Sequence, residues 1–224
     1  MTASTQQEVA TPHGPALVHL HPADGVDGDG DGAPRAVLVL GHGAGGGVGA
    51  PDLLATCRVA NRSGLLVALV EQPYRVAGRR PPAPATQLDA SWLAVVQHLR
   101  AGDLGQLPLI TGGRSSGARV ACRTAQRTAS AGVLCLAFPL HPPGRPGVTR
   151  QAELDELDLA GLPVLVVQGK SDRFGTPLAA PTRSVVAVAG DHSLNRDLRA
   201  VEQTVDRWLT ALVAGLRGGP ADPS

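Results

Sequence analysis

Short, almost entirely apolar runs that alternate with longer segments of helical periodicity constrain the fold of this chain most. Clear examples are "AVLVL" (36–40), "LLVALV" (65–70) and "VLVVQ" (164–168). Such runs indicate strands whose two faces are both covered, as in a parallel sheet with helices on each side. We therefore predict an α/β fold with a mostly parallel sheet and helices on both faces. Four further runs have a similar composition, at residues 16–20, 107–111, 133–138 and 184–189.

Two segments show the periodicity of amphipathic helices. The first begins at Thr86, which has the spacing of a capping box with Asp89, and it ends at Gly102. The second extends from about residue 195 to residue 216, with leucine and valine at helical intervals along one side. We expect both helices to pack on the sheet. The apolar stripe of the first helix consists of Leu88, Trp92, Val95 and Leu99.

The length of 224 residues, with 43% of them hydrophobic, is sufficient for one α/β domain with a full core. We expect a single domain over residues 1–224. The proline-rich segment 75–86 is predicted to be a loop, because proline disrupts the interior of a helix. The terminal segments 1–6 and 217–224 are predicted to be frayed.

The charge balance and the cysteines exclude several classes of function. Twenty basic and 19 acidic residues give a net charge of +1, so no basic field attracts nucleic acid or an anionic membrane. Cys57, Cys122 and Cys135 are scattered and odd in number, which argues against a disulfide framework and a zinc site. With no secretory leader or membrane-spanning run either, we expect a cytoplasmic protein.

The strand at 107–111 runs into "GGRSSGARVA", a glycine-rich segment with two serines. Only Ser115 is centred in a G-x-S-x-G pattern, because Gly113 and Gly117 lie two residues to either side of it. This pattern is typical of a nucleophile on a sharp strand-to-helix turn, where small neighbours let the backbones pack closely. We therefore interpret Ser115 as a candidate nucleophile, while a serine in an ordinary glycine-rich turn is the simpler alternative.

A nucleophilic serine needs a histidine base and a carboxylate that orients it. Asp172 follows the strand at 164–168, and His192 follows the strand at 184–189. Folds that carry a nucleophile on a strand-to-helix turn have the order serine, acid, histidine along the chain. The order of Asp172 and His192 after Ser115, and their places at strand ends, match that order. Asp191 is the alternative carboxylate, but neighbours in an extended loop point apart, so we favour Asp172.

The strand at 36–40 is followed by a second glycine-rich loop that includes Gly41, His42 and Gly43. The tetrahedral intermediate of acyl transfer needs two backbone N–H donors, and we predict that Ala44 and Ser116 provide them. His42 is then a structural residue that orients the loop. Of the remaining residues near the predicted sheet edge, His141 and Tyr74 are candidates for the lining of a substrate pocket.

Together these segments resemble a known family. "GHGAGG", "EQPYRVAGRRPP", "GGRSSGARVA", "FPLHPPGRPG", "VQGKSDRFGT" and "GDHSL" are similar to motifs of the α/β-hydrolase family that includes dienelactone-hydrolase-like proteins and the testis-expressed-30 and NSL-complex-subunit-3 relatives. The resemblance covers roughly residues 35 to 215. It implies an eight-stranded, mostly parallel hydrolase sheet and a triad of Ser115, Asp172 and His192. The segment between Pro139 and Leu162 is short, so we expect little or no lid. Dienelactone hydrolases themselves typically have cysteine at the position of Ser115.

Two further motifs have alternative interpretations. Gly41, Gly43 and Gly46 fit the dinucleotide fingerprint, and Glu71 ends the next strand, so an NAD-binding protein is a third hypothesis. That fingerprint needs a helix at the glycines, and Pro51 and the many glycines favour a loop instead. "DGDGDG" (27–32) lacks the final glutamate of a calcium loop, so we predict a solvated turn and no metal site.

The sequence therefore predicts a serine hydrolase that acts on ester-like bonds (carboxylester, thioester or lactone) of a small-molecule acyl substrate, without a metal or cofactor. A binding or scaffold protein that retains the hydrolase fold without turnover is the second hypothesis. Nothing in the sequence specifies the oligomeric state.

Overall fold

The structure is a computed structural model that describes residues 4–24 and 33–217. The predicted turn at 27–32 lies outside these residues, as does the segment 218–224 of the predicted C-terminal end.

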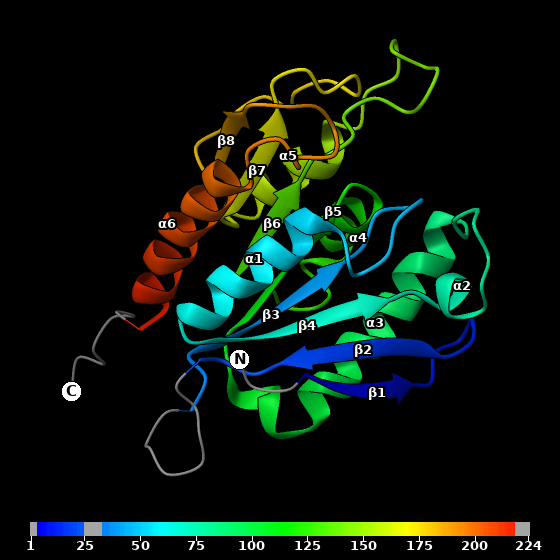
Figure 1. Cartoon of the computed structure of the whole chain (residues 1–224), viewed down its shortest axis with the longest axis vertical. Helices are drawn as coiled ribbons and strands as arrows, with labels where there is room; N and C mark the ends of the chain where they lie inside the picture. Colours follow the sequence, from blue (N-terminus) through cyan, green and yellow to red (C-terminus); the bar gives the residue numbers. More distant parts are fainter. Residues whose placement is uncertain (1–3, 25–32, 218–224) are drawn as a thin grey trace.

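An eight-stranded sheet lies at the centre of the fold, with the strand order β1-β2-β4-β3-β5-β6-β7-β8 (Figure 1). The hairpin β1–β2 pairs antiparallel with β4, and the six strands from β4 to β8 in this order are parallel. The carboxyl ends of the parallel strands therefore meet at one edge of the sheet. The strands are β1 (Thr5–Val9), β2 (Ala16–His21), β3 (Ala36–Gly41), β4 (Leu65–Glu71), β5 (Leu109–Arg114), β6 (Gly132–Leu136), β7 (Val164–Gly169) and β8 (Arg183–Val188).

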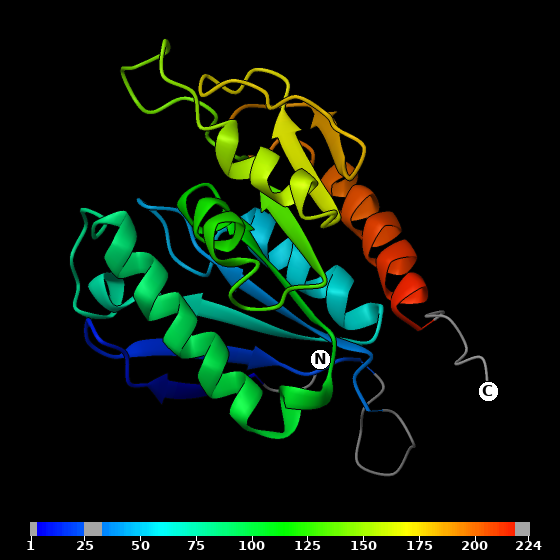
Figure 2. The ribbon, with the colours of Figure 1, turned by 180° about the vertical axis from the view of Figure 1, so that it is seen from behind.

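Helices cover both faces of the sheet. Figure 1 shows α1 (Pro51–Arg62) and α6 (Leu198–Arg217) on one face. Figure 2 shows α3 (Ala85–Ala101), α4 (Ser116–Thr124) and α5 (Ala152–Leu159) on the other. The short helix α2 (Pro73–Val76) and the 3₁₀ turn η1 (Asp103–Gln106) complete the described elements. Within residues 4–24 and 33–217, no helix combines the length and apolar character that crossing a membrane requires.

The core explains why the strands are apolar on both sides. Successive residues of β3 point to opposite faces: Leu38 and Leu40 pack in the cluster under α1 and α6, whereas Val37 and Val39 pack under α3. All four side chains are buried. The predicted α/β fold with helices on both faces is confirmed. Between β6 and β7 the chain forms α5 and loops, and no lid domain is inserted there, as predicted.

Two predictions about chain segments were wrong in part. The N-terminal segment 1–6 was predicted to be frayed, but β1 begins at Thr5, which pairs with Leu20 of β2. The sequence of β1, TQQEV, is mostly polar because four of its five side chains are not buried, so the apolar pattern could not reveal this strand. The predicted loop at 75–86 is also shorter, because α2 extends to Val76 and α3 begins at Ala85.

The predicted capping box of the α3 helix was wrong. The helix begins at Ala85, and its N-cap residue Pro84 makes no side-chain cap hydrogen bond. Asp89 instead accepts hydrogen bonds of 2.6 and 2.9 Å from Arg123 of α4. Arg119, also on α4, donates to Glu153 of α5. Helix α4 is thus joined by ion pairs to the helices on both of its sides.

At the carboxyl ends of β3 and β5, α4 comes into backbone contact with the sheet at three glycines. A Cβ atom on Gly117 would lie 2.3 Å from the carbonyl oxygen of Gly41, and one on Gly113 would lie 2.5 Å from the same atom. Real Cβ atoms do not approach a carbonyl oxygen so closely. The small residues of the predicted G-x-S-x-G pattern are therefore required by the packing of α4 on β3.

We predict that Gly117→Ala destabilises the protein, because the added methyl group must push α4 away from β3. Overpacking of this kind costs about 1–3 kcal/mol in the free energy of unfolding, which chemical denaturation measures. Gly46→Ala is the matched control, since no atom lies within 4 Å of the Cβ position there. Equal stabilities of the two variants would contradict the packing argument.

Candidate active site

Ser115 occupies the junction between β5 and α4 in a strained backbone conformation. Its φ and ψ angles are 53° and −107°, although it is not glycine. Its N–H donates a 2.9 Å hydrogen bond to the carbonyl of Leu136 on β6, which helps to hold the turn. A backbone of this kind costs on the order of 1–3 kcal/mol and is concentrated at functional sites. The strain presents the side chain of Ser115 at the carboxyl edge of the sheet, where it is partly exposed.

The side chains of Ser115, His192 and Asp172 form one hydrogen-bonded chain. The Nε2 atom of His192 lies 2.9 Å from Oγ of Ser115, and its Nδ1 atom lies 2.8 Å from Oδ2 of Asp172. Because a carboxylate only accepts, Nδ1 carries the proton and Nε2 is left as an acceptor for the serine hydroxyl. The arrangement therefore has the hydrogen bonds that proton transfer from serine to histidine requires.

The Asp172 carboxylate is fully buried and both of its oxygens accept hydrogen bonds. Oδ2 accepts from His192 and, at 2.7 Å, from the amide of Gln168 on β7, while Oδ1 accepts from the N–H of Phe174 at 2.9 Å. By contrast, the exposed Asp191 accepts hydrogen bonds from Ser193, and these lower the pKa of Asp191. Of the two carboxylates considered from the sequence, Asp172 is the one that contacts His192.

The sequence interpretation missed two residues that support this chain. Gln168 ends the apolar run of β7 and is fully buried, so one polar residue in an otherwise apolar strand could have indicated it. The ring of Phe174 packs edge-on against His192, with 4.6 Å between ring centroids. No pattern in the sequence marks Phe174, because it lies in a loop. Both residues limit the orientations that His192 and Asp172 can adopt.

The two predicted oxyanion donors lie on opposite sides of the serine in the chain. Ser116 is the first residue of α4, and Ala44 lies in the loop after β3. Among residues 4–24 and 33–217, neither backbone N–H donates to another protein group. Free N–H groups at a helix start and in an adjacent loop are available to an oxygen that carries developing negative charge.

His42 holds the loop after β3 in place and does not contact Ser115. Its Nδ1–H donates to the carbonyl of Gly43 at 2.8 Å, and its Nε2 accepts from the N–H of Gln72 at 3.1 Å. Burial lowers the pKa of His42, which keeps the ring neutral and suited to this pair of bonds. Tyr74 donates from its hydroxyl to the carbonyl of Ala44 at 3.0 Å and so supports the same loop.

The comparison with known protein families found one match. The family described as an alpha/beta hydrolase domain matches residues 34–216. The chain belongs to the α/β-hydrolase family. No curated protein sequence was found to match it.

Solved structures show that this α/β hydrolase shares its fold with distant relatives. Est1E from Butyrivibrio proteoclasticus is similar over 93% of this chain and 99% of its own, with 15% identity and a TM-score of 0.75. A serine hydrolase without a lid from Xanthomonas campestris covers 100% of this chain and 98% of its own, with 19% identity and a TM-score of 0.70. A dienelactone hydrolase from Anabaena variabilis is similar over 93% of this chain and 97% of its own, with 16% identity and a TM-score of 0.69.

The structure does not provide the helix that a dinucleotide site would need. In this α/β hydrolase, α1 begins at Pro51, so the glycines from 43 to 49 form a loop without a helix start. The third hypothesis from the sequence therefore lacks its structural requirement. Within residues 4–24 and 33–217, no three or more His, Cys, Asp or Glu side chains are grouped to hold a metal ion.

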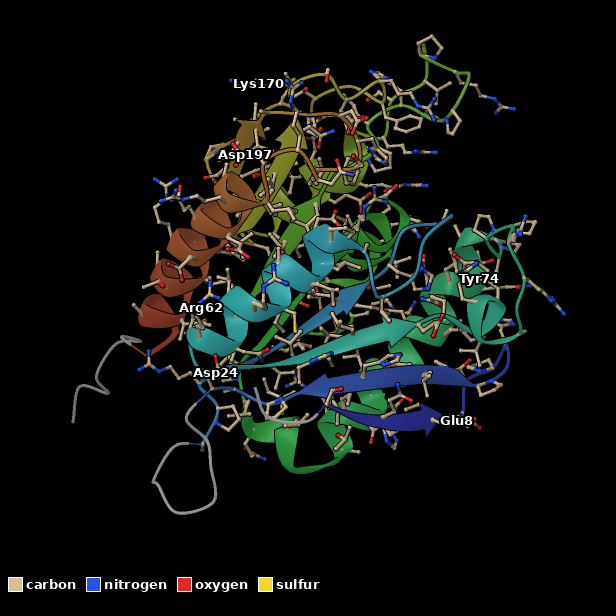
Figure 3. All side chains as sticks on the ribbon, in the orientation of Figure 1. Glu8, Asp24, Arg62, Tyr74, Lys170 and Asp197 are labelled. Carbon is tan, nitrogen blue, oxygen red and sulfur yellow. The ribbon has the colours of Figure 1, made fainter. Side chains whose placement is uncertain are left out.

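Two cavities are lined by residues beside the candidate site. One of about 340 Å³ is lined by His141, Arg173 and Phe174, the residue that contacts His192. Another of about 360 Å³ is lined by Gln72 and by Tyr74 of α2, and Figure 3 labels Tyr74. Each of the two residues proposed to line a pocket, His141 and Tyr74, thus borders one of these cavities. Each cavity therefore has a wall that contacts either His192 or the loop after β3.

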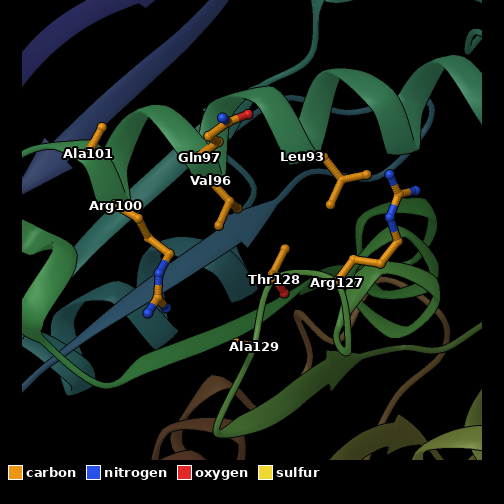
Figure 4. A pocket seen from close by; sticks show the side chains of 8 residues that line it. All are labelled: Leu93, Val96, Gln97, Arg100, Ala101, Arg127, Thr128 and Ala129. Atoms are coloured by element: carbon orange, nitrogen blue, oxygen red, sulfur yellow. The ribbon is translucent and has the colours of Figure 1, made fainter.

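A larger cavity lies elsewhere. It measures about 550 Å³ and lies between α3 and the turn after α4, with Arg100 and Arg127 at opposite ends (Figure 4). None of the residues that line it belongs to the triad or the loop after β3. Cavity size alone therefore does not mark the candidate site in this hydrolase.

Tyr74 offers a direct measurement on the supporting loop, because it is the only tyrosine in the sequence. Burial raises the pKa of its hydroxyl to about 12. We predict that absorbance titration of the folded protein shows tyrosinate formation near this value, and that the unfolded protein titrates near about 10. Since the folded pKa is the higher one, its contribution to stability is complete below about pH 10 and is lost as pH rises through 12.

A Tyr74→Phe variant is the control for this titration, because it removes the signal. A midpoint near 10 in the folded protein would show that the hydroxyl is open to solvent and is not held against Ala44.

Proposed function

We propose that this protein is a serine hydrolase that cleaves ester-like bonds through an acyl-enzyme intermediate. The observation that carries the proposal is the continuous chain of hydrogen bonds from Ser115 through His192 to the buried Asp172. Membership of the α/β-hydrolase family and the strained backbone of Ser115 support it. The proposed substrates are carboxylesters, thioesters and lactones, and in each of them the reacting atom is a carbonyl carbon.

In the first half of the reaction, Oγ of Ser115 attacks the carbonyl carbon while Nε2 of His192 takes the hydroxyl proton. The protonated ring is stabilised by Asp172, which accepts from Nδ1. As the tetrahedral intermediate collapses, His192 gives its proton to the leaving alcohol or thiol. In the second half, a water molecule loses a proton to Nε2, attacks the acyl group and releases the acid, and the proton returns to Ser115.

The oxygen of the tetrahedral intermediate gains negative charge and needs donors that are already in place. We assign this role to the backbone N–H groups of Ala44 and Ser116, of which the second also benefits from the positive end of α4. Loss of one such donor in other hydrolases costs about 10²–10³ in kcat. The bonds that His42 and Tyr74 make to the loop after β3 keep Ala44 in position for this role.

Labelling by a fluorophosphonate probe tests the nucleophile without a known substrate. We expect one stoichiometric adduct, which intact-mass analysis and peptide mapping place on Ser115. Ser115→Ala abolishes the adduct. Ser116→Ala is the matched control and keeps it, because Ser116 acts through its backbone N–H. A folded wild-type protein that forms no adduct would support a binding or scaffold protein instead, and an adduct on Ser116 would overturn the choice of serine.

The choice of acid is tested by a pair of isosteric variants. Asp172→Asn removes the charge that orients and stabilises the protonated His192, and we expect kcat on a small chromogenic ester to fall by about 10⁴-fold. Asp191→Asn changes the neighbouring carboxylate, which contacts only Ser193 among the described side chains. We expect its kcat to stay within a few-fold of wild type. A large loss in Asp191→Asn with a small loss in Asp172→Asn would reverse the assignment.

A further inference from the structure

Arg114, the residue before the candidate nucleophile, contacts three parts of the site at once. Its Nη2 donates to the backbone carbonyl of His192 at 3.1 Å. Its Nε lies 2.9 Å from Oδ2 of Asp52 on α1. Its Nη1 lies 2.8 Å from the point where a Cβ on Gly43 would stand, so the guanidinium packs against the loop after β3. The side chain of the residue next to Ser115 thus connects His192, the loop after β3 and helix α1.

Asp52 fixes the orientation of this guanidinium. It is the second residue of α1, its side chain is fully buried, and its Oδ1 accepts from the N–H of Leu53 at 3.0 Å. Burial raises the pKa of Asp52, and the charge of Arg114 opposes that shift. A buried carboxylate without a cation is costly, so Asp52 and Arg114 depend on each other. The side chain of Arg114 is itself only 17% exposed.

We propose that Arg114 and Asp52 form a positioning pair that holds the His192 loop and the Gly43–Ala44 segment at the distances that acyl transfer requires. The proposal rests on the proposed function and adds a determinant of its rate that the triad pattern does not contain. Arg114 acts through His192 and Gly43 and need not touch the substrate.

The geometry explains why the guanidinium group matters in addition to its charge. A planar fork donates in several fixed directions, so it reaches a carboxylate and a carbonyl at the same time. Lysine has a compact ammonium group on a flexible stem and cannot hold the same two acceptors in fixed directions. Arg114→Lys therefore keeps the charge beside Asp52 and loses the fixed link to His192.

The first test is the rate of labelling of Ser115 by the fluorophosphonate probe, together with kcat and KM on a small chromogenic ester. We expect Arg114→Gln, Arg114→Lys and Asp52→Asn to lower the labelling rate and kcat by about 10- to 100-fold, because displacements near 1 Å have effects of this size. KM is expected to change little. The Arg114→Gln, Asp52→Asn double variant is expected to be no slower than Arg114→Gln, because the pair acts as a unit.

Arg58→Gln is the matched control. Arg58 is also on α1 and also forms an ion pair, with Glu202 at 3.0 Å, but that pair is on the surface and away from the site. Thermal melting of each variant measures stability separately. A purely structural role predicts lower melting temperatures with unchanged rates. Wild-type rates in a folded Arg114→Lys or Arg114→Gln would overturn the proposal.

A second measurement does not depend on turnover. The proton between Nδ1 of His192 and Asp172 gives a downfield proton NMR resonance when the ring is held in place. We expect this resonance in wild type and in Arg58→Gln, and its loss or broadening in Arg114→Gln and Asp52→Asn. If wild-type protein resists the probe, the proposed hydrolysis fails, and this resonance still decides the role of Arg114. An unchanged resonance in both variants would overturn the positioning pair.

Discussion

The contact between the backbones of β3 and α4 is the constraint on which the site depends. Gly41 at the end of β3 lies against Gly113 and Gly117, which precede and follow Ser115. This contact brings the loop after β3 next to the start of α4. As a result, one proposed oxyanion donor comes from each side of the contact. Ser115, with its strained backbone, lies between the two glycines that make this contact.

Much of the fold and the three side chains of the hydrogen-bonded chain were predictable from the sequence, for a physical reason. Parallel strands buried on both faces leave continuous apolar runs, and their carboxyl ends share one edge. A polar residue within a few positions of the end of such a run is therefore placed in space as well as in sequence. Ser115, Asp172 and His192 all have this relation to β5, β7 and β8. The family resemblance supplied the eighth strand, which the apolar pattern did not show.

The parts that could not be predicted depend on contacts between distant segments. Arg114 and Asp52 are unremarkable in the sequence, and their pairing follows from the packing of α1 beside β5. The spacing of Thr86 and Asp89 suggested a local cap, but Asp89 pairs with Arg123 because α3 and α4 lie side by side. The strand β1 has a polar sequence and is fixed by its main-chain pairing with β2. A local pattern cannot distinguish such alternatives.

The residues of the candidate site follow strands that differ in their place in the sheet. Ser115 follows β5 at the centre of the sheet, whereas His192 follows β8, which is an edge strand that pairs only with β7. Edge strands and the loops after them open locally more readily than central strands do. Separation of β8 from β7 would take His192 away from Ser115 while the pairing of β3 with β5 stayed intact. The proposed hydrolytic chemistry would then be lost at a temperature where most of the core is still folded.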